Sequence, residues 1–246
     1  MLVWFSDYLR KVYKPSHEPF PIMVRVTSYT ITPELERLKL ERSSTFQHSH
    51  EVADLSLKVY HGLKRYCHAG PSFIERVVGI FNGDMGRFNH ICFELDYLGE
   101  QDMLDGAMYH DIGKLCLDDD MLVQRSNLRE WERKEIETHS QHGYEMMKNF
   151  FSQRGDVLDC ILYHHESYNG KGYPTRLKAE DIPLCARIVT VADHFDAMTH
   201  RPSFDENNNV LSPKEVGEAL VEMTKMKKKY DPLVFMIFKQ VVSSKK

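Results

Sequence analysis

Histidine and aspartate are the residues of this sequence with the clearest capacity for chemistry. The chain holds 13 histidines in 246 residues. Two adjacent pairs, His110-Asp111 and His164-His165, each stand shortly before a glycine-containing turn. Imidazole and carboxylate groups together suit first-row metal ions. An aspartate can bridge two such ions, and a bridged pair can clamp a phosphate and generate hydroxide near neutral pH.

Helical periodicity indicates which further histidines and aspartates face the interior. In the helix expected over 46–66, His48 lies on the apolar stripe, whereas His50 is about 200° further round the helix and points elsewhere. In the helix expected over 130–150, His139 falls on the apolar stripe. Inward histidines from separate helices favour a shared metal site.

The helix expected over 184–199 carries two carboxylates on one face. Asp193 and Asp196 are three residues apart, and Asp193 lies beside the apolar Val189. A carboxylate on an apolar face is costly unless a partner stabilises its charge. A metal ion is a suitable partner, so this helix is expected to reach the same site.

Composition places the chain among globular proteins. Hydrophobic residues make up 42% and charged residues 28%, which excludes a disordered or collagen-like chain. The length fits one large domain or a core domain with a small appendage. Lys and Arg number 32 against 36 Asp and Glu, a net charge of −4. This balance argues against a partner that is a nucleic-acid polymer, but it allows a local basic pocket.

The chain shows no export or membrane signal. No apolar run approaches the roughly 18–20 residues that cross a bilayer. Residues 1–5 are apolar but lack a basic flank and a small-residue cleavage site. We therefore expect no membrane partner and a cytoplasmic location. The five cysteines form no C-x-x-C pair, so reduced, buried thiols are expected instead of disulfides or a zinc ribbon.

The elements that must position these residues are mostly helices, so the fold class is expected to be all-α. Pro33 predicts the start of one helix, and helical periodicity continues from residue 43 onward. The β-branched run over 22–32 predicts a small β element near the N-terminus. Turn residues predict a loop over 167–175. We expect a short N-terminal extension over 1–42, followed by one domain over 43–246.

At this point the sequence resembles a known family, the HD-GYP branch of the HD-domain metal-dependent phosphohydrolases. Three blocks carry the resemblance: His110-Asp111-Ile112-Gly113-Lys114, His164-His165-Glu166 with Gly170 and Gly172-Tyr173-Pro174, and the run from Ile182 to Thr199 that contains Asp193 and Asp196. The blocks occur in the family's order, which makes the combined motif far more specific than any block alone.

The resemblance implies an all-α bundle that holds a two- or three-metal centre. It implies hydrolysis of a cyclic dinucleotide, most often cyclic di-GMP, to linear pGpG or GMP by a metal-bridging hydroxide. Asp111 would bridge the ions and so take part in catalysis. The implied metal ligands are His48, His110, Asp111, His139, His164, His165 and Asp193.

The resemblance also implies the cofactor and the substrate contacts. The ions would be iron or manganese, with nickel and zinc as alternatives. Lys114 would be a catalytic residue that contacts the scissile phosphate and assists the leaving group. The remaining substrate-binding residues would be Gly170, Gly172, Tyr173, Pro174 and Arg201.

The chain departs from the family pattern in three places. Ser44 stands where some members place a glutamate that helps to hold a third metal, so a two-metal centre is expected. Arg201 is retained, but the basic residue that often follows in the family is missing. The stretch between His48 and His110 is longer than usual, which predicts an extra helical insertion over about 67–98 that caps the site, binds a partner or is only peripheral.

Two other functions are compatible with the residues. One is a phosphohydrolase that acts on cyclic GMP-AMP or another nucleotide. The other is a catalytically weak sensor that binds a cyclic dinucleotide. A homodimer or a signalling partner could use the N-terminal extension or the insertion.

Overall fold

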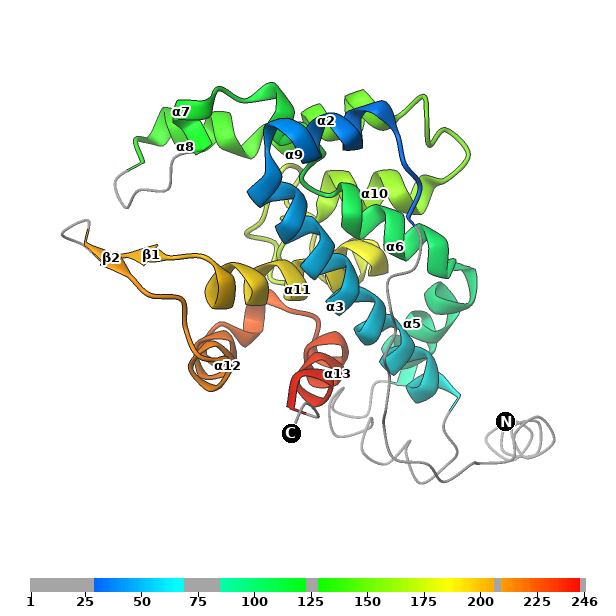
Figure 1. Ribbon diagram of the computed structural model, residues 1–246. Coiled ribbons are helices and arrows are strands. Elements are labelled where there is room, and N and C mark those ends of the chain that lie inside the picture. The colour runs from blue at the N-terminus through cyan, green and yellow to red at the C-terminus, as the bar shows by residue number, and fades with distance from the viewer. Residues whose placement is uncertain (1–28, 69–84, 123–127, 206–208, 244–246) are drawn as a thin grey trace, which may run out of the picture.

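The computed structural model describes residues 29–68, 85–122, 128–205 and 209–243 of the chain. These residues form a bundle of helices with one two-stranded antiparallel ribbon (Figure 1). The elements are α2 (Pro33–Glu41), α3 (Ser43–Cys67), α5 (Met85–Tyr97), α6 (Glu100–Tyr109), η1 (Ile112–Cys116), α7 (Asp119–Leu122), α8 (Glu130–Glu137), α9 (His139–Met147), α10 (Gly155–Tyr163), η2 (Ala179–Asp181), α11 (Leu184–His200), β1 (Ser203–Phe204), β2 (Val210–Leu211), α12 (Val216–Lys225), η3 (Lys227–Lys229) and α13 (Pro232–Ser243).

The long helix α3 organises the bundle. It packs against α6, α11 and α13 and runs through the middle of the molecule (Figure 1). Val52, Val59 and Leu63 recur at helical spacing on its inner face and are fully buried. Each such burial contributes ~1.5–3 kcal/mol. This packing brings the start of α3 against α11.

The all-α class expected from the sequence is confirmed. Helix α2 begins at Pro33, and the Thr32 side chain accepts a hydrogen bond from the Leu35 backbone N–H at 3.2 Å. Helix α13 begins at Pro232. Residues 167–175 form turns and irregular structure, as their glycines and proline predict. No described helix has both the length and the apolar character that a membrane span requires.

The helix expected over 130–150 is divided into α8 and α9. The break is at Thr138, whose backbone N–H and side-chain hydroxyl both donate to the Glu135 carbonyl, at 3.1 and 2.6 Å. A threonine hydroxyl that bonds the preceding turn competes with regular helical hydrogen bonding. Apolar periodicity alone does not reveal this competition.

The β element expected near the N-terminus is not found in the part of it that is described. Residues 22–28 lie outside the described residues, and 29–32 form no strand. Within the described ranges, the β pairing joins Ser203 to Leu211 and Phe204 to Val210. The stretch over 29–32 instead leads into α2, where Thr32 serves as the cap.

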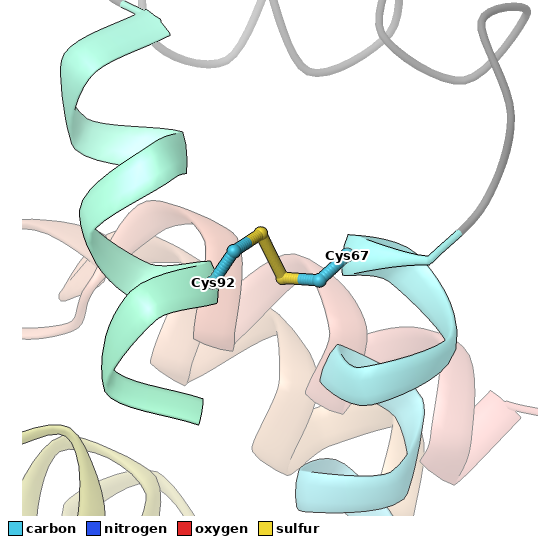
Figure 2. Close-up of a disulfide and its surroundings, with 2 residues drawn as sticks. All are labelled: Cys67 and Cys92. Carbon is cyan, nitrogen blue, oxygen red and sulfur yellow. A yellow bond between two sulfur atoms is a disulfide. The ribbon is translucent and has the colours of Figure 1, made fainter. Parts of the chain in front are cut away.

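The expectation of reduced thiols is wrong for one pair of cysteines. Cys67 at the end of α3 and Cys92 on α5 form a disulfide, with Cα atoms 5.5 Å apart (Figure 2). Cys160 and Cys185 are buried free thiols, and Cys116 is an exposed one. The paired cysteines are 25 residues apart in the sequence, so no short sequence motif predicts their contact.

The predicted insertion over 67–98 contributes to the core in its described part, α5. Residues 69–84 lie outside the described residues. Phe88, Ile91 and Leu95 of α5 are buried in the main hydrophobic cluster. Glu94 pairs with the buried Arg187 of α11. This second half of the insertion is therefore an integral helix of the bundle.

Candidate metal centre

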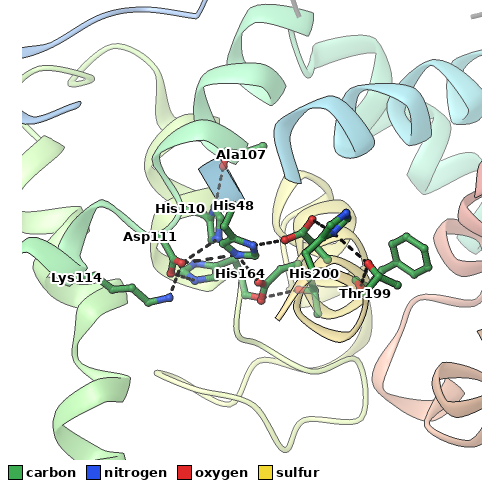
Figure 3. Close-up of polar contacts among 12 residues, drawn as sticks. His48, Ala107, His110, Asp111, Lys114, His164, Thr199 and His200 are labelled. Atoms are coloured by element: carbon green, nitrogen blue, oxygen red, sulfur yellow. Dashed lines mark hydrogen bonds and ion pairs between the residues drawn. The ribbon is translucent and has the colours of Figure 1, made fainter. Parts of the chain in front are cut away.

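His48 lies near the start of α3, where its imidazole meets two carboxylates of α11. Its Nε2 atom is 3.0 Å from Asp193 Oδ1, and its Nδ1 atom is 2.5 Å from Asp196 Oδ2 (Figure 3). All three residues are buried. A carboxylate on one ring nitrogen fixes the tautomer and the orientation of a metal-binding histidine. Asp196 is placed to do this for His48.

The junction between α6 and η1 supplies the next two residues. His110 directly follows α6 and donates its Nδ1–H to the Ala107 carbonyl at 2.7 Å. Asp111 follows, and its Oδ2 atom is paired with the Lys114 ammonium and lies 3.5 Å from His110 Nε2. The same atom is 3.8 Å from His48 Nε2. Asp111 therefore faces histidines from two helices.

Glycine at position 113 allows η1 to approach α9. A Cβ atom on Gly113 would lie 1.9 Å from the His139 carbonyl oxygen and 2.4 Å from the Gly143 backbone nitrogen. No other residue type fits at this distance without displacing one of the two elements. The contact holds Asp111 beside His139, whose Nε2 atom is 3.3 Å from Asp111 Oδ1.

Two further histidines come from the end of α10 and face His139. The Nδ1–H groups of His139 and His164 are donated to the Ile136 and Ile161 carbonyls, at 2.6 and 2.9 Å. Their Nε2 atoms then carry lone pairs, yet these two atoms are only 3.2 Å apart. Two acceptors repel at this distance unless a cation lies beside both. His165 packs edge-on against His139, with ring centroids 5.0 Å apart.

The donor atoms could hold metal ions in two groups that share Asp111. His48, His110 and Asp111 form one group, and Asp111, His139, His164 and His165 form the other. The Nε2 atom of His110 is buried and has no hydrogen-bond partner. An orphaned imidazole nitrogen aimed into a set of carboxylate and imidazole donors fits a first-row metal ion.

Burial sets the protonation of the cluster except at His48, where hydrogen bonds to Asp193 and Asp196 outweigh burial and raise the pKa. Burial lowers the pKa of His139 to about 4 and holds the pKa values of His164 and His165 well below the ordinary histidine value. Burial alone would raise the pKa of Asp111, but the adjacent Lys114 ammonium and the surrounding histidines hold it well below its usual range. Neutral imidazoles and an ionised carboxylate are the forms that bind metal.

The glycine-rich loop after α10 supports His165 from one side. The Tyr173 ring stacks on the His165 ring, with centroids 4.7 Å apart. Gly172 permits this fold of the loop, because a Cβ atom there would lie 2.5 Å from the Glu166 Cα atom. Glu166 is buried and accepts hydrogen bonds from the Thr175 backbone N–H and hydroxyl, at 2.7 and 2.9 Å. Burial raises the pKa of Tyr173, so its phenol stays protonated.

A cavity of about 920 Å³ opens next to the metal centre. His48, Asp196 and Lys114 line it on the side of the metal centre, and Arg201 lines it from the end of α11. Its apolar lining residues are Met121, Leu122, Leu128, Ile136 and Pro202. This volume lies within the range of small-molecule sites, with the cationic side chains of Lys114 and Arg201 beside an apolar wall.

The structure brings the seven predicted ligands together. They come from α3, the α6–η1 junction, α9, the end of α10 and α11. That each of them binds an ion stays a prediction. His50 packs against Tyr29 instead of the cluster, as its helical position predicts.

The predicted substrate-binding residues fall into two groups. Lys114 and Arg201 line the cavity. The loop residues Gly170, Gly172, Tyr173 and Pro174 are not among its lining residues, and Tyr173 instead contacts His165. Their contact with a substrate stays a prediction.

Sequence reasoning did not single out two polar residues of the cavity. Arg42 pairs with Asp119 and donates to the Leu117 carbonyl at 3.1 Å, which ties the start of α3 to α7. His200 lines the cavity at the end of α11. Neither residue belongs to a motif block. Only the three-dimensional contact between distant segments identifies them.

Comparison with known proteins gives the following matches. The sequence pattern of the HD domain family matches residues 93–234. The chain is 42% identical over 103 residues to the cyclic di-GMP phosphodiesterase response regulator RpfG of Xanthomonas campestris pv. campestris, a match that covers 41% of this chain and 27% of that protein. It is 33% identical over 109 residues to the 3′3′-cGAMP-specific phosphodiesterase 2 of Vibrio cholerae, covering 44% of this chain and 21% of that protein.

The matched regions span about a quarter of the length of these relatives. Among solved structures, the chain is similar to the HD domain of the L. monocytogenes phosphodiesterase PgpH. The TM-score is 0.50 at 15% identity, and the match covers 86% of this chain and 96% of that chain. At this identity the likeness shows a shared fold.

Proposed function

The chain belongs to the HD domain family, and on that premise we propose that it is a metal-dependent phosphodiesterase that hydrolyses a cyclic dinucleotide. The observation that carries the proposal is the pair of donor groups that share Asp111 beside a cavity of about 920 Å³. Cyclic di-GMP is the proposed substrate, because relatives in the matched region are named for it. The proposed product is linear pGpG or GMP.

Two divalent ions, iron or manganese, are the proposed cofactors, with nickel and zinc as alternatives. Ser44 lines the cavity and offers no carboxylate for a third ion. When bound, such ions supply Lewis acidity and a hydroxide nucleophile near neutral pH. The residues proposed to hold them are His48, His110, Asp111, His139, His164, His165 and Asp193.

Lys114 is the proposed contact to the scissile phosphate. Its ammonium is paired with Asp111 and lines the cavity. A preorganised cation at this place would stabilise negative charge on the phosphate oxygens in the transition state. The backbone carbonyls that hold His110, His139 and His164 in position keep the donor set rigid, so little reorganisation is needed.

Cyclic GMP-AMP is the second candidate substrate. Three relatives in the matched region are named as 3′3′-cGAMP-specific phosphodiesterases. Both dinucleotides contain two phosphodiester groups and two purines, so both match the chemistry of the cavity. A substrate comparison with the same preparation decides between them.

The test is hydrolysis of both cyclic dinucleotides by purified chain loaded with Mn²⁺ or Fe²⁺, with products separated by chromatography. Wild-type protein is expected to yield a linear dinucleotide, and Asp111→Asn is expected to lose at least about 10³-fold in rate, because it removes the charge shared by both donor groups. Asp96→Asn, on the exposed side of α5, is the matched control. Metal-loaded protein that binds but never cleaves either dinucleotide would establish a sensor instead.

Location and partners complete the proposal. The substrate class favours a cytoplasmic location. Disulfides persist mainly in oxidising compartments, so this location predicts that thiol trapping in intact cells finds Cys67 and Cys92 reduced, whereas an intact Cys67–Cys92 bond would contradict it. A second copy or a signalling partner could bind through 1–42 or the insertion. On α5, Phe93 and Tyr97 are exposed and lie with ring centroids 4.7 Å apart. This exposed aromatic pair supports binding through the insertion.

A further inference from the structure

The cavity beside the metal centre contains a carboxylate that has no cationic partner among the described residues. Three carboxylates line this cavity, those of Glu51, Asp119 and Asp196. Asp119 pairs with Arg42. Asp196 pairs with His48. Glu51, on α3, contacts only a neutral amide. A bare carboxylate in a cavity for an anionic substrate is unfavourable unless the substrate brings hydrogen-bond donors to it.

Gln47 holds Glu51 and leaves one of its oxygens open. The two residues lie one turn apart on the side of α3 that lines the cavity, and the Gln47 side-chain amide donates to Glu51 Oε1 at 2.8 Å. In the described part of the chain no hydrogen bond reaches Glu51 Oε2. A carboxylate held in this way suits a ligand edge with two adjacent N–H donors.

The α7–α8 region supplies an apolar wall to the same cavity. Arg42, at the start of α3, pairs with Asp119 of α7, so this wall flanks the end of α3 that carries Gln47 and Glu51. A flat heterocyclic ligand buries its faces against apolar side chains and needs polar partners at its edge. The cavity offers both. The residues of the wall are Met121, Leu122, Leu128 and Ile136.

Glu51 also lies within reach of a nucleotide that is bound at the metal centre. It follows His48 by three residues on α3, which is about 4.5 Å along the helix axis. Both residues line the cavity, as does Lys114. A ribose separates the base of a nucleotide from its phosphate. A phosphate beside Lys114 therefore allows the base to extend along α3 to Glu51.

We propose that Glu51, positioned by Gln47, recognises the Watson–Crick edge of one guanine of the substrate. This inference rests on the proposed function. Guanine presents two adjacent donors, N1–H and the N2 amino group, and both would donate charge-assisted hydrogen bonds to the carboxylate. Adenine presents one donor, its N6 amino group, beside the acceptor N1, which a carboxylate oxygen repels.

A single carboxylate recognises a single base. Glu51 therefore selects dinucleotides that contain guanine over cyclic di-AMP. Cyclic di-GMP and cyclic GMP-AMP each contain at least one guanine, so Glu51 alone does not separate these two substrates.

The test measures kcat/KM of Mn²⁺-loaded protein for cyclic di-GMP, cyclic di-IMP and cyclic di-AMP. The base of cyclic di-IMP differs from guanine only in lacking the N2 amino group. We expect wild-type protein to prefer cyclic di-GMP about tenfold over cyclic di-IMP and about 100-fold over cyclic di-AMP, because one or both charge-assisted hydrogen bonds are lost.

Glu51→Gln is the variant with a directional effect. A glutamine amide can accept from the N6 amino group of adenine and donate to its N1 atom. We therefore expect the ratio of kcat/KM for cyclic di-GMP to that for cyclic di-AMP to fall at least about tenfold, with bound metal unchanged. Asp54→Asn is the matched control. It removes the same charge from α3 at a residue that pairs with Lys58 and does not line the cavity, so it should keep the wild-type ratio.

The same ratio in wild type and Glu51→Gln would overturn the inference. A change of equal size for all three dinucleotides would show that Glu51 acts only through its charge, which also overturns it. If wild-type protein cleaves none of the three, the proposed function fails, and competition binding of the same dinucleotides to Mn²⁺-loaded protein tests the inference separately. A preference for cyclic di-GMP that Glu51→Gln abolishes would support it, whereas equal affinities or no binding would overturn it.

Discussion

Tyr173 and His165 form the contact by which the loop after α10 reaches the metal centre. Replacing Tyr173 with alanine removes the stacked ring, so we expect His165 to lose its fixed orientation and metal affinity to fall about 10–100-fold. Tyr173→Phe retains the ring and is expected to keep wild-type metal affinity. Isothermal titration with Mn²⁺ measures both. A phenylalanine variant as weak as the alanine variant would show that the hydroxyl, not the stacking, is what matters.

Buried neutral histidines make the metal-free protein sensitive to acid. The pKa of His139 is lowered to about 4, below the unfolded value of about 6.5. Such a group adds stability that is fully present above pH 6.5 and is lost as the pH falls towards 4, because the unfolded chain binds more protons. His164 and His165 act in the same direction.

For His139 alone the expected loss of unfolding free energy between pH 7 and pH 4 is about 2–3 kcal/mol. Urea unfolding of chelator-treated protein across this pH range measures it. His139→Gln should show a shallower slope than wild type. An identical slope in the two proteins would contradict the assignment of this buried neutral imidazole.

Among the elements, η1 and α9 are in contact only because residue 113 lacks a side chain. Gly113→Ala places a Cβ atom 1.9 Å from a backbone oxygen, so we expect η1 to move, bound metal to be lost and stability to fall by at least about 3 kcal/mol. Gly217→Ala is the matched control, since nothing lies within 4 Å of its added Cβ atom in α12. It is expected to stabilise the protein by up to about 1 kcal/mol.

The disulfide ties α5 to the end of α3. Cys67→Ser removes the cross-link that restricts the unfolded chain. We therefore expect the free energy of unfolding to fall by about 3 kcal/mol, since the bonded cysteines are 25 residues apart in the sequence. Chemical denaturation under non-reducing conditions measures it. Cys116→Ser removes an exposed free thiol and should have little effect. Equal stability of Cys67→Ser and wild type would mean that the thiols are reduced in solution.

The sequence predicts those elements whose limits are set locally. Pro33 and Pro232 mark helix starts, and the apolar stripe of α3 predicts which way His48 faces. The break at Thr138 depends on one hydroxyl that bonds the preceding turn, and the disulfide depends on two helices meeting. The position of Arg42 depends on contacts with Leu117 and Asp119, which are far away in the chain and which periodicity does not encode.

At the scale of the whole molecule, the candidate metal centre joins five separate parts of the bundle. The predicted ligands come from α3, the α6–η1 junction, α9, the end of α10 and α11. An ion that binds only this folded arrangement stabilises it by about 2.7 kcal/mol at a free concentration one hundred times its Kd. Because the predicted ligands come from so many helices, metal binding should raise the free energy of unfolding of the whole bundle.

Removal of metal by a chelator is therefore expected to lower Tm by about 5–10 °C in a single cooperative transition. Differential scanning calorimetry with and without added Mn²⁺ measures this shift. Asp111→Asn should show little shift, and Asp96→Asn should behave like wild type. A wild-type Tm that does not respond to metal would argue that the cluster holds no ion in solution.

The Cys67–Cys92 bond also alters the covalent topology of the chain. It encloses the intervening residues in a ring, so a single proteolytic cut anywhere between the two cysteines opens the ring without releasing a fragment. Protein nicked there would migrate as one species on a non-reducing gel and as two on a reducing gel. The segments that carry His48 and His110 would thus remain covalently joined through the disulfide, and nicked protein could refold as a single molecule.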